Sequence, residues 1–174
     1  GDDTAFGQAG NDDVRGGAGN DTLQGNDGDD SVNGMDGNDT LDGNLGFDTL
    51  FGGSGDDLLI STDGNDQVLG QGGSADTFTF NGDNTIADIF TITAVADVNP
   101  GTGRVGIGLA RLNPGLSFTT VLLGVEVFTL NLNGGNDLVT LGDLAAVNDL
   151  TVLNINGGDG NDTIDGSLST STTV

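Results

Sequence analysis

The chain has 174 residues, of which 27 are acidic and three are basic, so its formal net charge is −24. This charge excludes nucleic acid as a partner, because contacts to phosphate need Lys and Arg. The absence of Cys and His excludes disulfides, structural zinc, thiol nucleophiles and the usual general base, and we expect no enzyme activity. No apolar run reaches about 18 residues, so we also expect no membrane span.

Residues 7–69 are seven consecutive nonapeptides, which begin with GQAGNDDVR, GGAGNDTLQ and GNDGDDSVN. In every unit the fourth place is Gly, the sixth is Asp and the eighth is aliphatic, and the first place is Gly in all units except the last. A partial unit precedes this array, and a unit lengthened by Ala75 follows it. A short fixed period with Gly, Asp and one apolar residue per unit is typical of a solenoid.

The eighth places predict a thin continuous core. Only one residue in nine is reliably apolar, so a single unit cannot bury a core, but stacked units would bring Val14, Leu23, Val32 and Leu41 together. The glycines permit positive φ angles, which aim backbone carbonyl oxygens at one point. A disordered acidic linker would have a similar composition. The strict spacing of the aliphatic residues favours the ordered solenoid, because a linker needs no register.

The nine-residue pattern resembles the glycine- and aspartate-rich nonapeptide of RTX proteins, G-G-x-G-x-D-x-aliphatic-x. The resemblance covers about the first half of the chain and returns once near the end, at residues 157–165 (GGDGNDTID). It implies a parallel β-roll that binds calcium between its turns. In that family six residues of a unit make a turn and three make a short strand, so two nonapeptides complete one coil.

The resemblance implies several Ca²⁺ ions along the roll. With two units per coil, residues 18 apart stack, such as Asp12 on Asp30, at a strand spacing of about 4.8 Å. Bare carboxylates that close repel each other, so the turns need a cation, and a hard cation takes oxygen ligands. Backbone oxygens of places one to four are implied to complete each site. The predicted ligands are Asp3, Asp12, Asp21, Asp30, Asp39, Asp48, Asp57, Asp66, Asp76 and Asp162, with Gly16, Gly17, Gly19, Gly25, Gly28, Gly34, Gly37, Gly43, Gly46, Gly52, Gly53 and Gly55.

From Thr77 the period changes from nine to two, which predicts β-strands over residues 77–132. Residues 129–137 resemble residues 152–162, with Asn-Gly-Gly triplets 23 residues apart, which predicts wider coils like those of a right-handed parallel β-helix. We therefore expect an all-β fold with three regions: an RTX β-roll at 1–76, a wider solenoid with an insertion at 77–156, and one nonapeptide with a tail at 157–174.

Several later outward positions of the roll are apolar, namely Phe51, Leu58, Ile60 and Leu69, and Leu45 and Phe47 replace polar turn residues. Contiguous exposed apolar residues usually mark a contact surface. We expect residues 85–125 to fold back over one face of the roll. The alternative is that another copy or another domain packs there.

Two motif matches are typical of other functions, but the sequence around them favours other interpretations. Residues 101–106 match G-x-G-x-x-G, but the β pattern on both sides favours a hairpin turn over a dinucleotide site. Paired carboxylates are typical of glycosidases, but here they recur in every unit, whereas a catalytic pair occurs once.

The resemblance implies a calcium-dependent structural module of a secreted bacterial surface protein, exported by a type I-like route, such as an adhesin, an extracellular filament or a surface-layer component. The alternative is a non-catalytic accessory domain of a secreted RTX enzyme or toxin. Both predict an extracellular location, with calcium, copies of the chain or neighbouring domains as partners. Ice binding ranks lower, because the third places of the units hold no Thr. Gly1 starts in mid-repeat, so we expect a longer protein.

Overall fold

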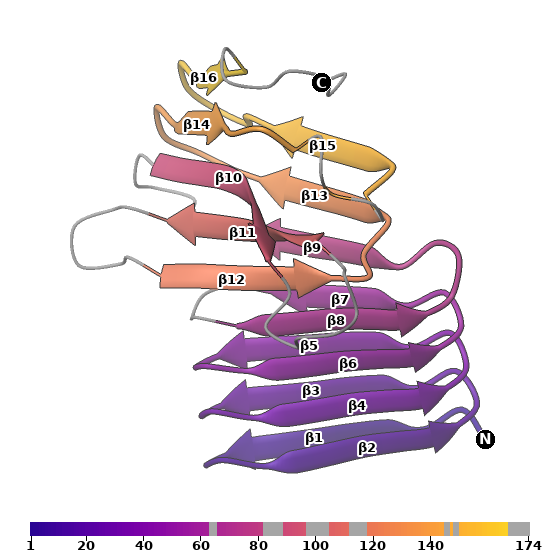
Figure 1. The fold of residues 1–174 in the computed structure, drawn as a ribbon. Helices are drawn as coiled ribbons and strands as arrows, with labels where there is room; N and C mark the ends of the chain where they lie inside the picture. Colours follow the sequence, from indigo (N-terminus) through magenta and orange to yellow (C-terminus); the bar gives the residue numbers. More distant parts are fainter. Residues whose placement is uncertain are drawn as a thin grey trace.

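The computed structural model describes residues 1–62, 66–81, 89–96, 105–111, 118–144, 147 and 150–166, which form two β-sheets stacked face to face (Figure 1). The seven-stranded sheet has the order β1-β3-β5-β7-β9-β13-β15, and the nine-stranded sheet has the order β16-β14-β10-β11-β12-β8-β6-β4-β2. No helix among these residues is long and apolar enough to cross a membrane.

The first nine strands are β1 (Thr4–Ala9), β2 (Asp13–Ala18), β3 (Thr22–Asp27), β4 (Ser31–Asp36), β5 (Thr40–Leu45), β6 (Thr49–Ser54), β7 (Leu58–Ser61), β8 (Gln67–Gly72) and β9 (Thr77–Asn81). The others are β10 (Ile89–Ala96), β11 (Val105–Arg111), β12 (Phe118–Leu123), β13 (Val127–Asn131), β14 (Leu138–Leu141), β15 (Val152–Asn156) and β16 (Thr163–Asp165).

Strands β1 to β8 form four coils of two nonapeptides each. Successive strands alternate between the two sheets, and strands two units apart pair in parallel, with Thr4 opposite Thr22 and Thr22 opposite Thr40. The register is therefore 18 residues. The predicted parallel β-solenoid with two units per coil is confirmed.

The division of each unit into strand and turn differs from the expected one. Strand β3 occupies six residues, the seventh place of one unit to the third place of the next, and the tight turn keeps only places four to six. The strand ladder skips the first place, since Gln24 pairs with Asp42 and Asn26 with Asn44 but the intervening glycines do not pair. The strand extends beyond three residues because third-place carbonyls accept hydrogen bonds from the fourth-place glycine one coil earlier, as Asp27 does from the Gly10 N–H at 2.8 Å.

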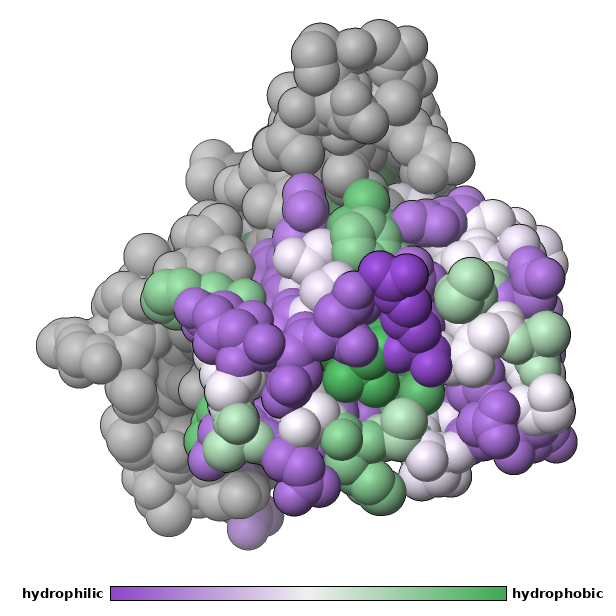
Figure 2. All heavy atoms as spheres, turned by 90° about the horizontal axis from the view of Figure 1, so that it is seen from below, coloured by the Kyte–Doolittle hydropathy of each residue, from purple (hydrophilic) through white to green (hydrophobic). Residues whose placement is uncertain are grey.

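The eighth-place residues form the predicted core. All seven, from Val14 to Val68, are buried, and six of them are completely inaccessible. Figure 2 views the molecule from the end formed by β1 and β2, where hydrophobic atoms at the centre are surrounded by mostly hydrophilic and small residues. The core is thus a narrow column between the two sheets.

The insertion does not fold back over a face of the roll. Strand β12 pairs in parallel with β8, and β11 and β10 follow as antiparallel neighbours in the nine-stranded sheet. The expected covering of one face is therefore wrong for the described strands. The physical reason is that β8 offers unpaired backbone groups at the sheet edge, which pairing with β12 satisfies. The turn expected at the G-x-G-x-x-G match lies mainly at residues 101–104, outside the described residues.

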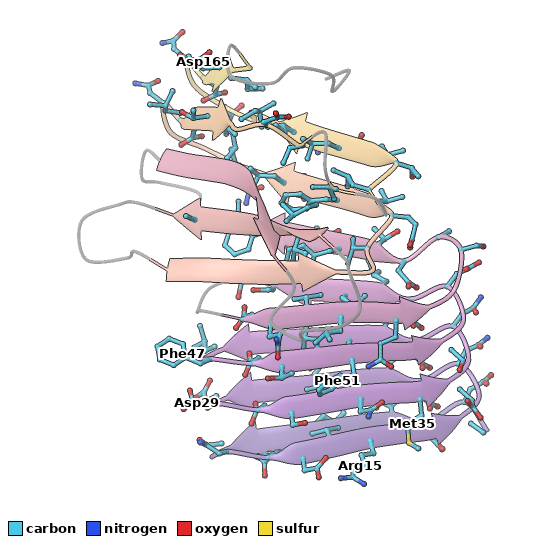
Figure 3. All side chains as sticks on the ribbon, viewed as in Figure 1. Arg15, Asp29, Met35, Phe47, Phe51 and Asp165 are labelled. Carbon is cyan, nitrogen blue, oxygen red and sulfur yellow. The ribbon has the colours of Figure 1, made fainter. Side chains whose placement is uncertain are left out.

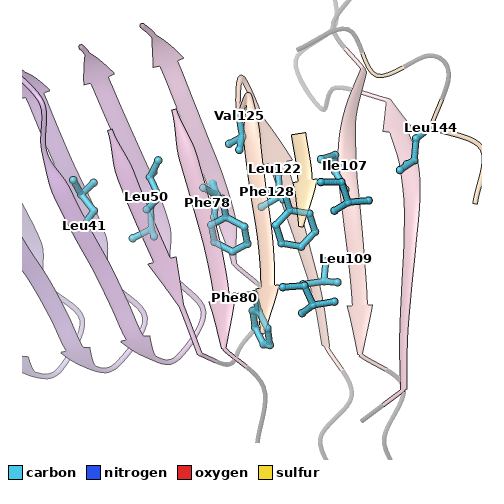
Figure 4. Close-up of a cluster of buried hydrophobic side chains, with 14 of the residues drawn as sticks. Leu41, Leu50, Phe78, Phe80, Ile107, Leu109, Leu122, Val125, Phe128 and Leu144 are labelled. Atoms are coloured by element: carbon cyan, nitrogen blue, oxygen red, sulfur yellow. The ribbon is translucent and has the colours of Figure 1, made fainter. Parts of the chain in front are cut away.

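The insertion widens the core, because it adds strands to one sheet only. Phe78, Phe80 and Phe128 from the seven-stranded sheet fill the added space against Ile107 and Leu109 of β11 (Figure 4). The rings of Phe78 and Phe128 lie with their centroids 5.5 Å apart. Large aromatic side chains therefore replace the Val and Leu of the regular coils where the coil is larger.

Beyond the insertion the coils are longer, and their register differs from the predicted one. Val127 of β13 pairs with Thr77 and with Val152, offsets of 50 and 25 residues. The Asn-Gly-Gly triplets, 23 residues apart, therefore do not stack on each other. An offset of 25 instead superposes Asp137 on Asp162, whose hydrogen bond joins the two turns.

Candidate metal sites at the two edges of the roll

The sixth-place aspartates lie in two columns, one at each edge where the sheets are joined. The first edge carries Asp3, Asp21, Asp39, Asp57 and Asp76, and the second edge carries Asp12, Asp30, Asp48 and Asp66. Within a column the Oδ1 of each aspartate accepts a hydrogen bond from the backbone N–H of the aspartate one coil earlier, at 2.7–2.9 Å. The step is 18 residues, or 19 where Ala75 is inserted.

The other carboxylate oxygen is left without a donor in most of these aspartates. Among the described residues, the Oδ2 atoms of Asp12, Asp21, Asp30, Asp39 and Asp57 are buried and accept no hydrogen bond. Burying a charged oxygen without a hydrogen-bond partner costs free energy. A bound cation would offset this cost, so the arrangement of these atoms fits a cation site. The donor set, a hard carboxylate oxygen, is the kind that Ca²⁺ prefers.

First-place glycines bring a second oxygen to the same spot. A Cβ atom on Gly16 would lie 2.3 Å from Oδ2 of Asp21 and 2.8 Å from the carbonyl oxygen of Gly34 in the next coil. Gly25 and Gly52 have the same surroundings, with distances of 2.3–2.4 Å to the carboxylate and 2.7–2.8 Å to the carbonyl. These glycines have ordinary φ angles, so the reason for Gly is steric. The missing side chain lets a carboxylate and a carbonyl oxygen converge.

Fourth-place glycines serve a different purpose. Gly28 and Gly37 both have φ of +136°, a conformation that other residues rarely adopt. A Cβ on Gly37 would also lie 1.8 Å from the carbonyl oxygen of Gly19. The carbonyls of places three and six are used in backbone hydrogen bonds between coils, whereas those of places one and four point at the glycine of a neighbouring coil.

The predicted glycine ligands therefore fall into three groups: place one (Gly16, Gly25, Gly34, Gly43, Gly52), place two (Gly17, Gly53) and place four (Gly19, Gly28, Gly37, Gly46, Gly55). The second place also has positive φ, but other units fill it with non-glycine residues such as Asn26 and Met35. Gly is therefore an option at place two, whereas the crowding at places one and four favours Gly there, with Ser61 as the exception at place one.

Burial and crowding act on the carboxylates of the first edge. Burial raises the pKa of Asp57 to about 6, against the hydrogen bond from the Asp39 N–H, and the charges of Asp76 and Asp39 raise it further. Burial likewise raises the pKa of Asp39 and of Asp76. A cation between the coils would offset both the desolvation and the repulsion.

Any metal site here needs backbone oxygens. Across the part of the chain that the structure describes, no three acidic side chains gather closely enough to hold an ion by themselves. Calcium takes six to eight oxygen ligands, so carbonyls of the glycine turns would have to supply several of them. The convergence of carboxylate and carbonyl oxygens at place one provides the start of such a set.

Glu126 extends the first column, which the sequence pattern did not reveal. The Asp76 N–H donates to Oε2 of Glu126 at 2.8 Å, as earlier aspartates donate to the next Asp. The turn between β12 and β13, Gly124 to Glu126, has three residues like the turns of the regular coils, so Glu126 stands where those turns have the sixth-place Asp. Its position in the sequence could have revealed it, because Glu126 directly precedes a strand, as each predicted ligand Asp does.

A second ladder runs through the fifth places. The Asn38 N–H donates to Oδ1 of Asn20 at 2.9 Å, and the Asp56 N–H donates to Oδ1 of Asn38 at 3.0 Å. These bonds point in the opposite direction to those of the sixth places, so each pair of coils is joined from both sides. The ladder is exposed, and Phe47 interrupts it, because a phenyl ring carries no acceptor.

Asp162 pairs with an aspartate that was not predicted. The Asp137 N–H donates to Oδ1 of Asp162 at 3.1 Å, and the Asn161 N–H donates to Oδ1 of Asn136 at 2.8 Å. Residues 132–140 thus form a nonapeptide turn of their own. The sequence pattern missed it because Leu132 stands in the first place, where the repeat has Gly.

Comparison with known proteins agrees with this geometry. The sequence model of the RTX calcium-binding nonapeptide repeat matches the chain in four copies, at residues 1–23, 15–50, 42–75 and 154–169. Together the copies span just over half of the chain. No curated protein matches it significantly.

Proposed function

The chain belongs to the RTX calcium-binding nonapeptide repeat family, and from this premise we propose that it is a non-catalytic, calcium-dependent structural module of a secreted bacterial surface protein. Adhesins, extracellular filaments and surface-layer components are proteins of this type. The observation that carries the proposal is the repetition of buried, unpartnered Oδ2 atoms along both edges of the roll.

Bound calcium would stabilise the fold by linking neighbouring turns. It supplies positive charge and flexible oxygen coordination between neighbouring turns. This chain's own residues hold the carboxylates in place, since the Oδ1 of Asp39 is fixed by the Asp21 N–H and its Oδ2 lies against Gly34. Binding energy of this kind becomes folding energy, because the unfolded chain has no preformed site.

Such coupling fits a secreted protein. Where free calcium is low, the acidic chain would repel itself and stay unfolded, which suits export through a channel. Outside the cell, millimolar calcium would complete the coils. The chain has no disulfides that could stabilise the folded state in place of calcium.

The regularity of the sites supports a scaffold. Similar carboxylates recur in successive coils, whereas a catalytic centre needs one set of groups with different environments. Two exposed apolar side chains lie close together in the chain at the second edge. Leu45 ends strand β5, and Phe47 lies in the turn that follows, where other turns carry mostly polar residues (Figure 3 labels Phe47). They support a role in contacts with other chains or domains.

The test is a calcium titration of the chain, followed by circular dichroism and calorimetry. We expect the chelated protein to lack most of its β signal and to regain it with binding of several ions. Asp39→Asn should raise the calcium concentration at the midpoint by about tenfold or more, equivalent to about 1.4 kcal/mol.

Asp36→Asn is the matched control, because it removes the same charge from an exposed side chain in the same unit. Its midpoint should stay close to that of the unchanged chain. A β signal that is the same with and without chelator, together with no measurable binding heat, would refute the proposal.

A further inference from the structure

Unit 61–69 begins with Ser where the other units of the array begin with Gly. The Ser61 hydroxyl donates a hydrogen bond to Oδ2 of Asp66, and both residues are buried. The Oδ1 of Asp66 accepts from the Asp48 N–H at 2.9 Å. Both carboxylate oxygens of Asp66 therefore have a donor from the chain, whereas the Oδ2 of Asp21 or Asp39 has none among the described residues.

The Ser61 carbonyl also occupies a different position from those of the first-place glycines. A Cβ on Gly7 or Gly34 would lie 2.6 Å from the first-place carbonyl oxygen of the next coil. At Gly43, whose next coil begins with Ser61, the three nearest atoms all belong to Asp48, the farthest at 3.1 Å. The Ser61 carbonyl oxygen therefore lies at least 3.1 Å from this position, farther than the 2.6–2.8 Å of the equivalent glycine carbonyls at Gly7, Gly16 and Gly34.

Thr62, in the second place of the same unit, makes a further contact of this kind. Its hydroxyl donates to the carbonyl oxygen of Asn44 at 3.4 Å. Two neighbouring hydroxyl groups therefore donate hydrogen bonds at the part of the second edge where Asp66 stacks on Asp48, which we call the Asp48–Asp66 level. Other units hold Gly, Asn, Gln or Met in this second place, none of which has a hydroxyl group.

We propose that Ser61, assisted by Thr62, holds the Asp48–Asp66 level together by hydrogen bonds. This level therefore binds Ca²⁺ more weakly than the glycine-led levels, which are those whose units begin with Gly. A cation at this level must displace the Ser61 hydroxyl from Asp66 and meets a first-place carbonyl oxygen that is set farther back than in the glycine-led coils. This inference rests on the proposed calcium binding and adds that the sites are unequal.

The level occupies a particular place in the fold. It lies in the coil of β7 and β8, and β8 is the strand to which β12 of the insertion pairs. A level that needs no cation would keep this junction between the regular and the longer coils ordered at calcium concentrations where the glycine-led coils open.

The test compares Ser61→Gly with the unchanged chain by calorimetry and by hydrogen exchange with mass spectrometry, using calcium alone as the probe. We expect Ser61→Gly to bind one more ion or to tighten its weakest site by about tenfold or more. We also expect residues 58–62 and 66–69 to be protected in chelator in the unchanged chain and to need calcium in the variant.

Ser54→Gly is the control, because it makes the same replacement at an exposed third place. Ser61→Ala removes only the hydroxyl and should also lose the protection in chelator. Exchange of residues 16–42 at saturating calcium reports whether each variant still folds.

Equal stoichiometry and affinity in Ser61→Gly and the unchanged chain, or unchanged protection in chelator in both Ser61 variants, would overturn the inference. An unchanged chain that binds no calcium would instead overturn the proposed function. The two failures are therefore distinguishable.

Discussion

At the scale of single residues, the repeat depends on which atoms each glycine leaves out. First-place and fourth-place glycines look alike in the sequence, but Gly34 has an ordinary φ and is needed for space, whereas Gly37 is needed for both space and a φ of +136°. The aspartate of each unit depends on this space, since its Oδ2 lies where a Cβ of the first-place residue would be.

Replacement of Gly34 by Ala tests the steric requirement. The added Cβ would lie 2.2 Å from Oδ2 of Asp39 and 2.6 Å from the carbonyl oxygen of Gly52, so the oxygens of one site must separate. We expect the calcium midpoint to rise by about tenfold or more, equivalent to about 1.4 kcal/mol.

Gly72→Ala is the matched control, since Gly72 also has an ordinary φ and its nearest atom would be 3.4 Å away. It should change stability by no more than about 0.5 kcal/mol. The calcium midpoints are measured by circular dichroism. Equal midpoints for the two alanine variants would show that the space at Gly34 is not needed.

The raised pKa of Asp57 predicts how the calcium-free protein responds to pH. Its folded pKa of about 6 exceeds the ordinary value of 3.8, so the folded state favours the protonated carboxyl. The resulting stability is fully present below the ordinary value and is lost as pH rises through about 6. In chelator, the β signal should therefore increase on acidification from about pH 7 to about pH 4.

Asp57→Asn provides the comparison, because an amide does not titrate. This variant should show a smaller gain of β signal over the same pH range in circular dichroism. A gain of equal size would assign the pH dependence to other groups.

At the scale of secondary-structure elements, the fold has two kinds of coil. The regular coils bury small and medium aliphatic residues between two equal layers, and the ladders of Asp and Asn side chains join their turns. From β9 onward the nine-stranded sheet gains the three strands of the insertion, and aromatic side chains fill the larger core. Stability of this second part therefore depends on packing more than on the turns.

Phe128→Ala tests that division. Phe128 is completely buried against Phe78, and removal of a buried aromatic ring typically costs about 3–5 kcal/mol. Hydrogen exchange at saturating calcium should rise in β9, β13 and β15, while residues 16–42 keep their protection. Phe128→Leu, which retains much of the volume, should have a smaller effect. A uniform rise along the whole chain would show that the two kinds of coil unfold as one unit.

At the scale of the whole molecule, the structure is an elongated stack with acidic turns along both edges (Figure 1). The predicted outward apolar residues lie where the register places them, with Phe51 opposite Leu69 in the nine-stranded sheet and Leu58 and Ile60 in the seven-stranded sheet. These four are half-buried by their neighbours. Leu45 and Phe47 are the more exposed pair, at 52% and 60%.

The double replacement of Leu45 and Phe47 by Asp tests the contact surface. Because both side chains are exposed, Leu45 at the end of β5 and Phe47 in the turn after it, calcium-dependent folding should survive with a small change in midpoint. Self-association in calcium, measured by analytical ultracentrifugation, should weaken. Phe6→Asp is the control, since Phe6 is similarly exposed but lies in β1, two strands away from β5 in the seven-stranded sheet. Equal association of all three proteins would contradict a contact at this turn.

The sequence by itself determined the period of nine, the core of eighth-place residues and the columns of sixth-place aspartates, because each repeats identically from one unit to the next. Once two units make a coil, Asp21 must stack on Asp39 whatever the rest of the chain does. Local pattern sufficed there, since all neighbours of a unit are copies of itself.

Tertiary structure decided the features that join unlike segments. Glu126 meets Asp76 across 50 residues, and Asp137 meets Asp162 across 25. The insertion entered the sheet instead of covering it, because an unpaired strand edge offers more hydrogen bonds than a finished sheet face. The difference between Ser61 and the glycines it replaces also became visible only in the fold, since it depends on where a carboxylate and a carbonyl oxygen meet.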